Sequence, residues 1–251
     1  MRLLLLHAGS HARETIRLPS YWLPALFFPL LFFALFGLAR ARDFAAAGVG
    51  SEYIITPFLL FSTLNVTLTA LAVSIASDRE NPWERRLRLL PISGLTRFGG
   101  RLLFVLAFNL VTWIPLLVTA AIATDLQLPL RMWPVWLAAV LVGAVPFAFL
   151  GMAFGYLLPG RAAMMAANLG FLVLSFLGGL FVPLEFMPDA VAAIAPYVPT
   201  HEWMHLVLAL IGRADHLTTP AWAIGLLAGW AVVFAGIAHW AFRRDEGVRY
   251  G

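Results

Sequence analysis

The 251-residue chain contains neither cysteine nor lysine. The absence of cysteine excludes disulfide bonds, iron–sulfur clusters and thiol nucleophiles. The absence of lysine excludes the phosphate-binding motif G-x-x-x-x-G-K-[ST] and any mechanism that begins with a lysine Schiff base. The chain therefore cannot bind ATP through a P-loop of its own.

Charged residues are also scarce, at 12% of the chain against about 25% in soluble domains. Hydrophobic residues make up 61%. A soluble protein of this length could not bury so much apolar surface, so we expect lipid to surround much of the chain. No internal repeat and no long low-complexity linker is visible in the sequence, which predicts a single membrane domain over residues 1–251.

Six stretches are apolar enough, and close enough to the roughly 20 residues that a bilayer requires, to predict membrane-spanning helices. They lie near residues 20–38, 54–76, 102–123, 134–158, 162–182 and 221–242. Residues 1–19 predict a short amphipathic helix that lies on the membrane surface, with its arginines toward the head groups. The expected fold class is an all-α polytopic membrane protein with six transmembrane helices.

The arginines predict the orientation of this topology. Six spans place both termini on one side, and thirteen of the 17 arginines fall on that side, with four on the other. The positive-inside rule then predicts a multi-pass protein of the plasma (inner) membrane with both termini in the cytoplasm. Because topology accounts for the net charge of +4, the basic composition does not indicate a nucleic-acid partner.

The loop between the second and third spans predicts a short helix of its own. Asn81 suits the N-cap, Pro82 the first helical position and Glu84 the third, and Pro91 ends the helix. Trp83, Leu87 and Leu90 share one face at helical spacing. A helix this short is marginal alone, so it requires a surface, either lipid head groups or a cytoplasmic protein.

Two segments carry a resemblance to a known family. The run IASDRENPWERRLRLLPISGLTRFGGRLL resembles the intracellular loop of ATP-binding-cassette (ABC) type-2 transporter permeases, with its acidic–basic–acidic start, short helix and P-[VI]-S. The run LGGLFVPLEFMPDAVAAIAPYVPTHEWMHLVLAL at 177–210 is similar to the segment that joins spans five and six in that family. Both occur in the expected order, so the resemblance covers nearly the whole chain.

The resemblance implies the membrane subunit of an exporter that moves a hydrophobic or amphipathic solute outward, such as a drug, a lipid or a lipid-linked glycan. ATP and Mg²⁺ would bind a separate ATPase present in two copies, so this chain is expected to hold no cofactor and to catalyse no reaction. A second permease copy, identical or a sister chain, would complete the assembly. The cytoplasmic loop helix would be the coupling helix that docks on the ATPase, through Pro82, Trp83, Glu84, Arg85, Arg86, Leu87, Arg88 and Leu90.

Polar residues inside the spans have two interpretations. They either form hydrogen bonds between helices or line a weakly polar translocation pathway. The residues concerned are Ser62, Asn65, Thr69, Asn109, Thr112, Asn168 and Ser175. The spans carry no acidic or basic residue at mid-depth, which argues against a proton relay.

Small residues and prolines predict two further features. The G-x-x-x-G pairs Gly151/Gly155 and Gly225/Gly229 predict close helix packing. The resemblance also implies re-entrant helices at the outer face between spans five and six, where the solute would exit. The residues assigned to this exit region are Gly178, Gly179, Pro183, Met187, Pro188 and Pro199.

The segment HEWMH raises an alternative. His201, Glu202 and His205 match H-E-x-x-H, in which two histidines on one helix face bind zinc, so a membrane-embedded zinc metalloprotease is the competing function. Catalysis also needs a third protein ligand, and His216 lies too far after His205 for the extended motif. The resemblance places this segment in the outer return helix, which favours a structural role and no metal. Glu185, Asp189 and Asp215 are possible further ligands to a metal held by His201 and His205, but nothing in the sequence fixes them.

Overall fold

The computed structural model describes residues 19–39, 41, 46, 50–81, 94–124, 126, 128–181, 184, 187–213 and 219–250, with side chains omitted at 19–25, 94–98 and 246–250. Every regular element in these residues is helical, as the sequence predicts. In chain order the elements are α2 (Pro19–Phe32), the π-helical turn η1 (Phe33–Gly37), α4 (Ser51–Glu80), α6 (Gly94–Ala123), the 3-10 turn η2 (Leu130–Met132), α7 (Trp133–Gly143), α8 (Val145–Leu157), α9 (Gly160–Leu177), α10 (Asp189–Ile194), the 3-10 turn η4 (Ala195–Tyr197), α11 (Pro199–Leu210) and α12 (Pro220–Tyr250).

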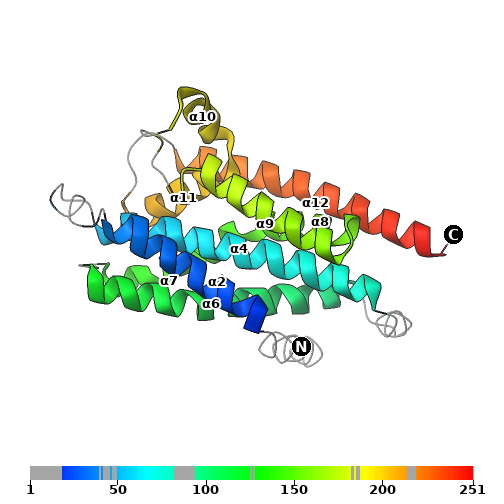
Figure 1. Ribbon diagram of the computed structural model, residues 1–251. Coiled ribbons are helices and arrows are strands. Elements are labelled where there is room, and N and C mark those ends of the chain that lie inside the picture. Colours follow the sequence, from blue (N-terminus) through cyan, green and yellow to red (C-terminus); the bar gives the residue numbers. More distant parts are fainter. Residues whose placement is uncertain are drawn as a thin grey trace.

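The long helices form a bundle in which they run roughly side by side (Figure 1). Five segments are long and apolar enough to cross a membrane, namely Ser51–Glu80, Gly99–Ala123, Leu130–Leu157, Gly160–Leu177 and Pro220–Asp245. A shorter apolar helix, Leu26–Gly37, corresponds to the first predicted span. The part of the chain that is described is therefore built to lie in a bilayer.

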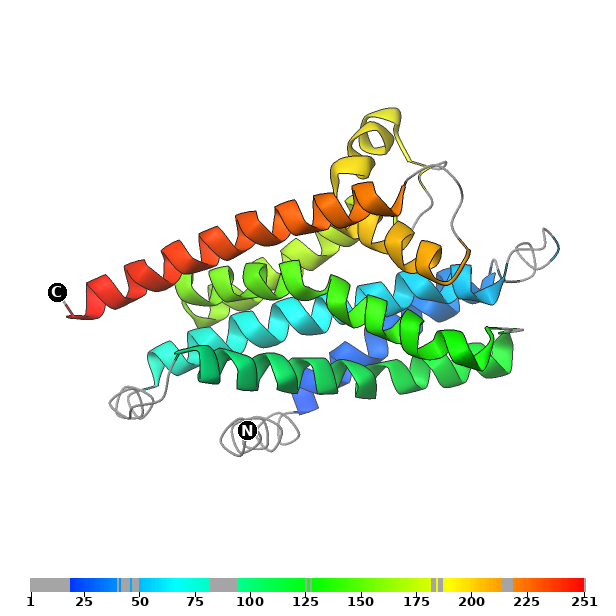
Figure 2. The ribbon, with the colours of Figure 1, turned by 180° about the vertical axis from the view of Figure 1, so that it is seen from behind.

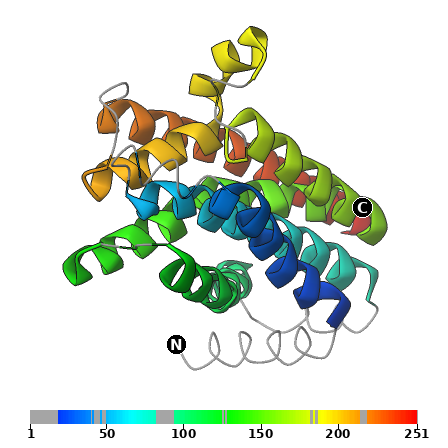
Figure 3. The same ribbon diagram turned by 60° about the vertical axis from the view of Figure 1, so that its left-hand side comes forward.

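The two ends of the bundle differ. One end carries the last turn of α4, the turn between α8 and α9, and the C-terminal part of α12 (Figures 1 and 2). The opposite end carries α11 and the small helix α10, which projects from the bundle (Figure 3). The short helices predicted between spans five and six therefore lie together at one end.

α4 forms the centre of the bundle. It packs against α2, α6, α8 and α9, and near its start against α7 and α11. Its residues from Phe58 to Leu68 are all buried, and 83% of its most apolar 18-residue window is buried, compared with 22% for α9 and α12. α4 is apolar on nearly all sides, so other helices can surround it. α9 and α12 lie at the outside of the bundle, with much of their surface exposed.

Three of the predicted spans end at clearly different residues from those expected, and one of them, α12, continues beyond residue 242 to Tyr250. α4 continues beyond residue 76 to Glu80, because hydrophilic residues remain helical beyond the apolar stretch. α9 ends at Leu177 rather than 182, because Gly179 adopts a φ of 76°. The amides of Gly179 and Leu180 bond the carbonyls of Phe176 and Ser175, at 3.0 and 2.9 Å, which completes a Schellman motif.

The fourth predicted span is not one uninterrupted helix. α7 ends at Gly143 and α8 begins at Val145, with a turn at Ala144 between them. Pro146 follows at once, and its missing N–H and bulky ring prevent the regular bond to the carbonyl four residues earlier. The span predicted over 134–158 is confirmed, because Leu130–Leu157 is long and apolar enough to cross a membrane, but the turn at Ala144 divides it into two helices.

One of the two predicted glycine pairs is used for packing. A Cβ at Gly155 would lie 2.7 Å from Cβ of Ile75, and one at Gly151 would lie 3.0 Å from the carbonyl oxygen of Leu68, so α8 approaches α4 closely only because both are glycine. A Cβ at Gly225 or Gly229 on α12 would meet no atom within 4 Å. The second pair therefore does not bring helices together within this chain.

Candidate functional site

The predicted coupling helix, Pro82 to Leu90, lies outside the described residues, and so do Pro183 and most of the predicted interfacial helix at 1–19. The structure does describe the turn that leads into the coupling segment. The last residues of α4, Asp78, Arg79 and Glu80, each bind a different part of the bundle. The sequence analysis had used Arg79 only as a positive charge that indicates orientation.

Arg79 is the most connected of these three residues. Its Nε donates to Oδ1 of Asp245 on α12 at 2.8 Å, and its Nη1 donates to the carbonyl oxygens of Gly155 and Leu158, at 2.9 and 3.0 Å. Nη2 of Arg101 on α6 donates to the Asp78 carboxylate. The backbone N–H of Gly160, at the start of α9, donates to Oε1 of Glu80 at 2.8 Å.

Three of the seven polar residues predicted to line a pathway lie in the seam between α4 and α6, namely Ser62, Asn109 and Thr112. Ser62 donates to Oγ1 of Thr112 at 3.2 Å, and Nδ2 of Asn109 donates to Oγ1 of Thr67 at 3.3 Å. All four side chains are buried. Between these two helices, the first interpretation, hydrogen bonds that hold the bundle together, describes what the side chains do.

The remaining predicted lining residues are in other settings. Thr69 donates to Oδ1 of Asn65 at 3.3 Å within α4. Asn168 on α9 is exposed, whereas Ser175 on the same helix is buried and its hydroxyl has no hydrogen-bond partner among the residues that the structure describes. Asn168 is thus the member of the set whose side chain faces outward from its own bundle.

Two buried tryptophans bind α4 through the same type of hydrogen bond, from the indole N–H to a threonine hydroxyl. Nε1 of Trp113 donates to Thr63 and Nε1 of Trp136 donates to Thr56, both at 3.0 Å. Each threonine hydroxyl in turn donates to the carbonyl four residues earlier on α4, at 2.6 Å. A hydroxyl can accept one bond and donate another, so α4 satisfies polar groups of α6 and α7 without exposing its backbone. The sequence analysis missed these pairs because Trp and Thr are common packing residues.

The exit-region residues lie where α9 meets α11. A Cβ at Gly178 would lie 2.1 Å from Oγ1 of Thr200, and that hydroxyl donates to the carbonyl of Leu174 at 2.6 Å. Met187 and Pro199 are buried and Pro188 is exposed. The structure thus brings Gly178 and Pro199 into one junction, while Pro188 lies at the start of the projecting α10.

HEWMH forms the first half of α11. His201 and His205 are adjacent on one face, with ring centroids 4.4 Å apart, and Nδ1 of His201 lies 3.4 Å from the carbonyl oxygen of Gly178. Trp203 is fully buried and donates to the carbonyl of Ala139 on α7 at 3.3 Å. α11 is therefore attached to α9 and α7 through Thr200, His201 and Trp203.

Glu202 is fully buried, and neither of its carboxylate oxygens has a hydrogen-bond partner among the described residues. Burial raises the pKa of the Glu202 carboxyl above its usual range. Burial, together with the neighbouring His205, lowers the pKa of His201 from 6.5 to about 4. Within the described part of the chain no group of three or more His, Asp or Glu side chains could hold a metal ion, so the third ligand required by the metalloprotease alternative is not found there.

A second ion pair lies at the α11 end. Oε2 of Glu52, in the first turn of α4, is 3.7 Å from Nη2 of Arg213, just beyond α11. Glu52 is fully buried and Arg213 is partly exposed. The sequence analysis missed this contact because Glu52 precedes the predicted span by two residues and Arg213 was counted only for orientation.

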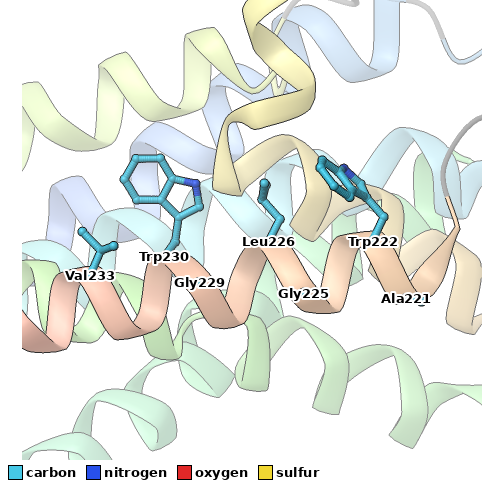
Figure 4. A pocket seen from close by; sticks show the side chains of 7 residues that line it. All are labelled: Ala221, Trp222, Gly225, Leu226, Gly229, Trp230 and Val233. Atoms are coloured by element: carbon cyan, nitrogen blue, oxygen red, sulfur yellow. The ribbon is translucent and has the colours of Figure 1, made fainter.

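The open glycine pair on α12 lines a shallow apolar groove of about 540 Å³ (Figure 4). Its walls are Ala221, Trp222, Gly225, Leu226, Gly229, Trp230 and Val233. Nε1 of Trp230 donates to the carbonyl oxygen of Tyr197 in η4 at 3.1 Å, which ties α12 to the segment before α11. The groove carries no ionisable side chain and therefore offers no chemistry beyond apolar contact.

The described helices form an apolar bundle that is long enough to cross a bilayer and carries paired charged side chains at one end. Residues 43–240 match the family described as "ABC-2 family transporter protein", and the chain belongs to this family of ABC transporter permeases. It is a multi-pass membrane protein, and members of the family usually lack catalytic activity and a cofactor of their own. The chain is 22% identical over 190 residues to the Bacillus subtilis (strain 168) protein named "Putative transport permease YvfS", covering 75% of this chain and 76% of that protein.

Proposed function

We propose that the chain, as a single domain over residues 1–251, is the membrane-spanning subunit of an ABC exporter. The observation that carries the proposal is the family match over 43–240, because that range includes both the loop 77–101 and the segment 177–210. ATP would be hydrolysed with Mg²⁺ by two copies of a separate ATPase. A second permease, identical or a sister chain, would complete the translocation pathway.

In this proposal all six predicted spans cross the plasma membrane. The shorter helix Leu26–Gly37, together with the preceding part of α2, supplies the first crossing. Both termini and the loop 82–93 then lie in the cytoplasm, beside the turn that joins α8 and α9. α10, η4 and α11 form the outer re-entrant segment that closes the exit.

The solute is proposed to be hydrophobic or amphipathic, such as a drug, a lipid or a lipid-linked glycan. The apolar middle parts of the described spans carry no ionisable group that could relay protons or bind an ionic solute tightly. Asn168 is the proposed lining residue with an exposed side chain, and it would face the pathway from α9. Ser62, Asn65, Thr69, Asn109, Thr112 and Ser175 would set the spacing of the helices around that pathway.

The coupling helix would seat Trp83 and Leu87 in a groove of the ATPase, with the arginines around them paired to acidic groups. The test is co-expression with a candidate ABC ATPase from the same genome. The double variant Trp83→Ala/Leu87→Ala should reduce co-purification of the ATPase at least tenfold and abolish ATP-dependent export of a fluorescent lipid analogue from vesicles. The matched control is Arg161→Ala, an exposed position at the start of α9.

Two outcomes would refute this proposal. If the double variant still binds and responds to the ATPase like the unmodified chain, residues 82–90 are not the docking site. If the purified protein hydrolyses peptides with bound zinc, and this activity disappears in His201→Ala, the metalloprotease alternative replaces the exporter.

A further inference from the structure

The last turn of α4 makes contacts that packing alone does not require. Successive residues of an α-helix point about 100° apart, so three adjacent side chains can reach three different neighbours only if the helix is surrounded. Asp78 binds Arg101 of α6, Arg79 binds Asp245 of α12 and the C-terminal carbonyls of α8, and Glu80 binds the first N–H of α9. Three consecutive residues of α4 thus hold four other helices.

These hydrogen bonds and ion pairs are shielded from water and fixed in orientation, so a movement of α4 would move the helices bonded to it. Asp78, Arg79, Arg101 and Asp245 each expose less than a fifth of their side chains, so water screens these pairs less than it would screen surface pairs. The Arg79 guanidinium is planar and binds a carboxylate and two carbonyls at once, which fixes its orientation. The carbonyls of Gly155 and Leu158 and the amide of Gly160 belong to helix ends that lack partners within their own helices.

The position of these residues gives them a role. Asn81 ends α4, and the segment proposed to dock on the ATPase begins with the next residue. A pull on that segment reaches the bundle first through Glu80, Arg79 and Asp78. Without their bonds, the pull would reach α6 only through the hydrogen bonds deeper in the seam between α4 and α6, and it would reach α8 and α9 through helix packing.

We propose that Asp78, Arg79 and Glu80 are positioning residues that distribute the movement of the ATPase-docking loop to α6, α8, α9 and α12. This inference rests on the proposed function, because it assumes that an ATPase grips the loop. It predicts that loss of one of these bonds reduces the ATP-driven movement of the one helix that the bond joins to α4.

The absence of cysteine allows a direct test, because two engineered cysteines give one pair of spin labels within each permease chain. One label is placed at Tyr197 in η4, at the opposite end of the bundle, and the other at Leu103 on α6, Met165 on α9 or Ile237 on α12, all exposed positions. The distances are measured by pulsed electron paramagnetic resonance in the permease–ATPase complex, with and without ATP trapped by vanadate.

In the unmodified complex, ATP should shift all three distances. Asp245→Asn should reduce the shift of the Ile237 pair by more than half and leave the Leu103 pair unchanged. Arg101→Gln should reduce only the Leu103 shift, and Glu80→Ala only the Met165 shift. Glu80→Gln keeps an oxygen that accepts from Gly160 and should restore the shift of the Met165 pair. Arg244→Gln, an exposed neighbour of Asp245, serves as the control.

The outcomes separate this inference from the function on which it rests. If ATP shifts the distances equally in the unmodified complex and in all three variants, the bonds transmit nothing. If each variant weakens all three shifts to the same extent, the residues have only a general structural role. If the unmodified chain binds no ATPase, the proposed function fails, and this inference fails with it. Co-purification of each variant with the ATPase shows that it is folded.

Discussion

His201 and Glu202 are adjacent ionisable residues at the start of α11, and burial moves their pKa values in opposite directions. α11 is not among the segments long and apolar enough to cross a membrane. The pKa of His201 falls from 6.5 to about 4, which keeps the imidazole neutral where it meets Gly178. The pKa of Glu202 rises, which favours its neutral form in the folded protein.

These shifts predict how stability depends on pH. Between pH 6.5 and about 4 the unfolded chain binds a proton on His201 that the folded chain does not, so this residue removes about 1.4 kcal/mol of unfolding free energy for each pH unit of acidification. His201→Asn should therefore lose less stability than the unmodified protein over that range. The measurement is denaturant unfolding of the purified protein in detergent at stepped pH.

Glu202→Gln provides a comparison of opposite sign. The folded chain keeps the Glu202 proton at pH values where the unfolded chain has lost it, so the stability linked to this residue is present in acid and lost as the pH rises. The variant should gain stability relative to the unmodified protein as the pH increases. Parallel pH curves for all three proteins would show that α11 is not buried as described.

At these positions the sequence predicts only part of the site. The spacing of His201 and His205 predicts that the rings meet on one helix face, and they do. The contacts of His201 with Gly178 and of Thr200 with Leu174 join residues more than twenty positions apart, so no local pattern indicates them. The match to H-E-x-x-H indicated a metal because the motif describes spacing and not the groups around it.

At the scale of helices, the seam between α8 and α4 depends on two glycines. Gly155→Ala would place a methyl group 2.7 Å from Cβ of Ile75, and neither helix backbone can yield without losing other contacts. We expect a loss of about 1–3 kcal/mol in unfolding free energy, as for other overpacked cores. Thermal unfolding in detergent, followed by circular dichroism, measures it.

Gly225→Ala is the matched control, since it changes the same residue type in a helix where the new methyl group meets no atom. It should be neutral or stabilise the protein by up to about 1 kcal/mol, because alanine favours the helix more than glycine does. If Gly225→Ala is the more damaging of the two, the groove on α12 is filled by something that needs glycine there.

Hydropathy predicted the order of the long helices but not their ends. It located α4, α6, α9 and α12 because each carries an apolar stretch of the required length. It missed the turn at Ala144, since the apolar stretch continues through the break. Hydropathy also did not indicate that α4 would be the central helix, because a central position depends on contacts with other helices on all of its faces.

At the scale of the whole molecule, the two ends of the bundle differ in charge. The end with the last turn of α4 carries Arg79, Arg101, Arg161, Arg243 and Arg244, whereas Arg131 and Arg213 lie at the α11 end. Arginine is retained on the cytoplasmic side during insertion. We therefore expect the α11 end to face outward and both termini to face the cytoplasm.

Single cysteines placed in this cysteine-free chain can test that orientation with a membrane-impermeant maleimide. Cysteine at the exposed positions Ile194 or Tyr197 should react in intact cells, whereas cysteine at Arg161 or Arg243 should react only after permeabilisation. A reporter fused before residue 1 should also require permeabilisation, because the helix ending at Gly37 must cross the bilayer for both termini to share a side. If that reporter is accessible in intact cells while a cysteine at Arg243 is not, the chain has five crossings. The arginines on each side of the membrane must then be counted again for the new topology.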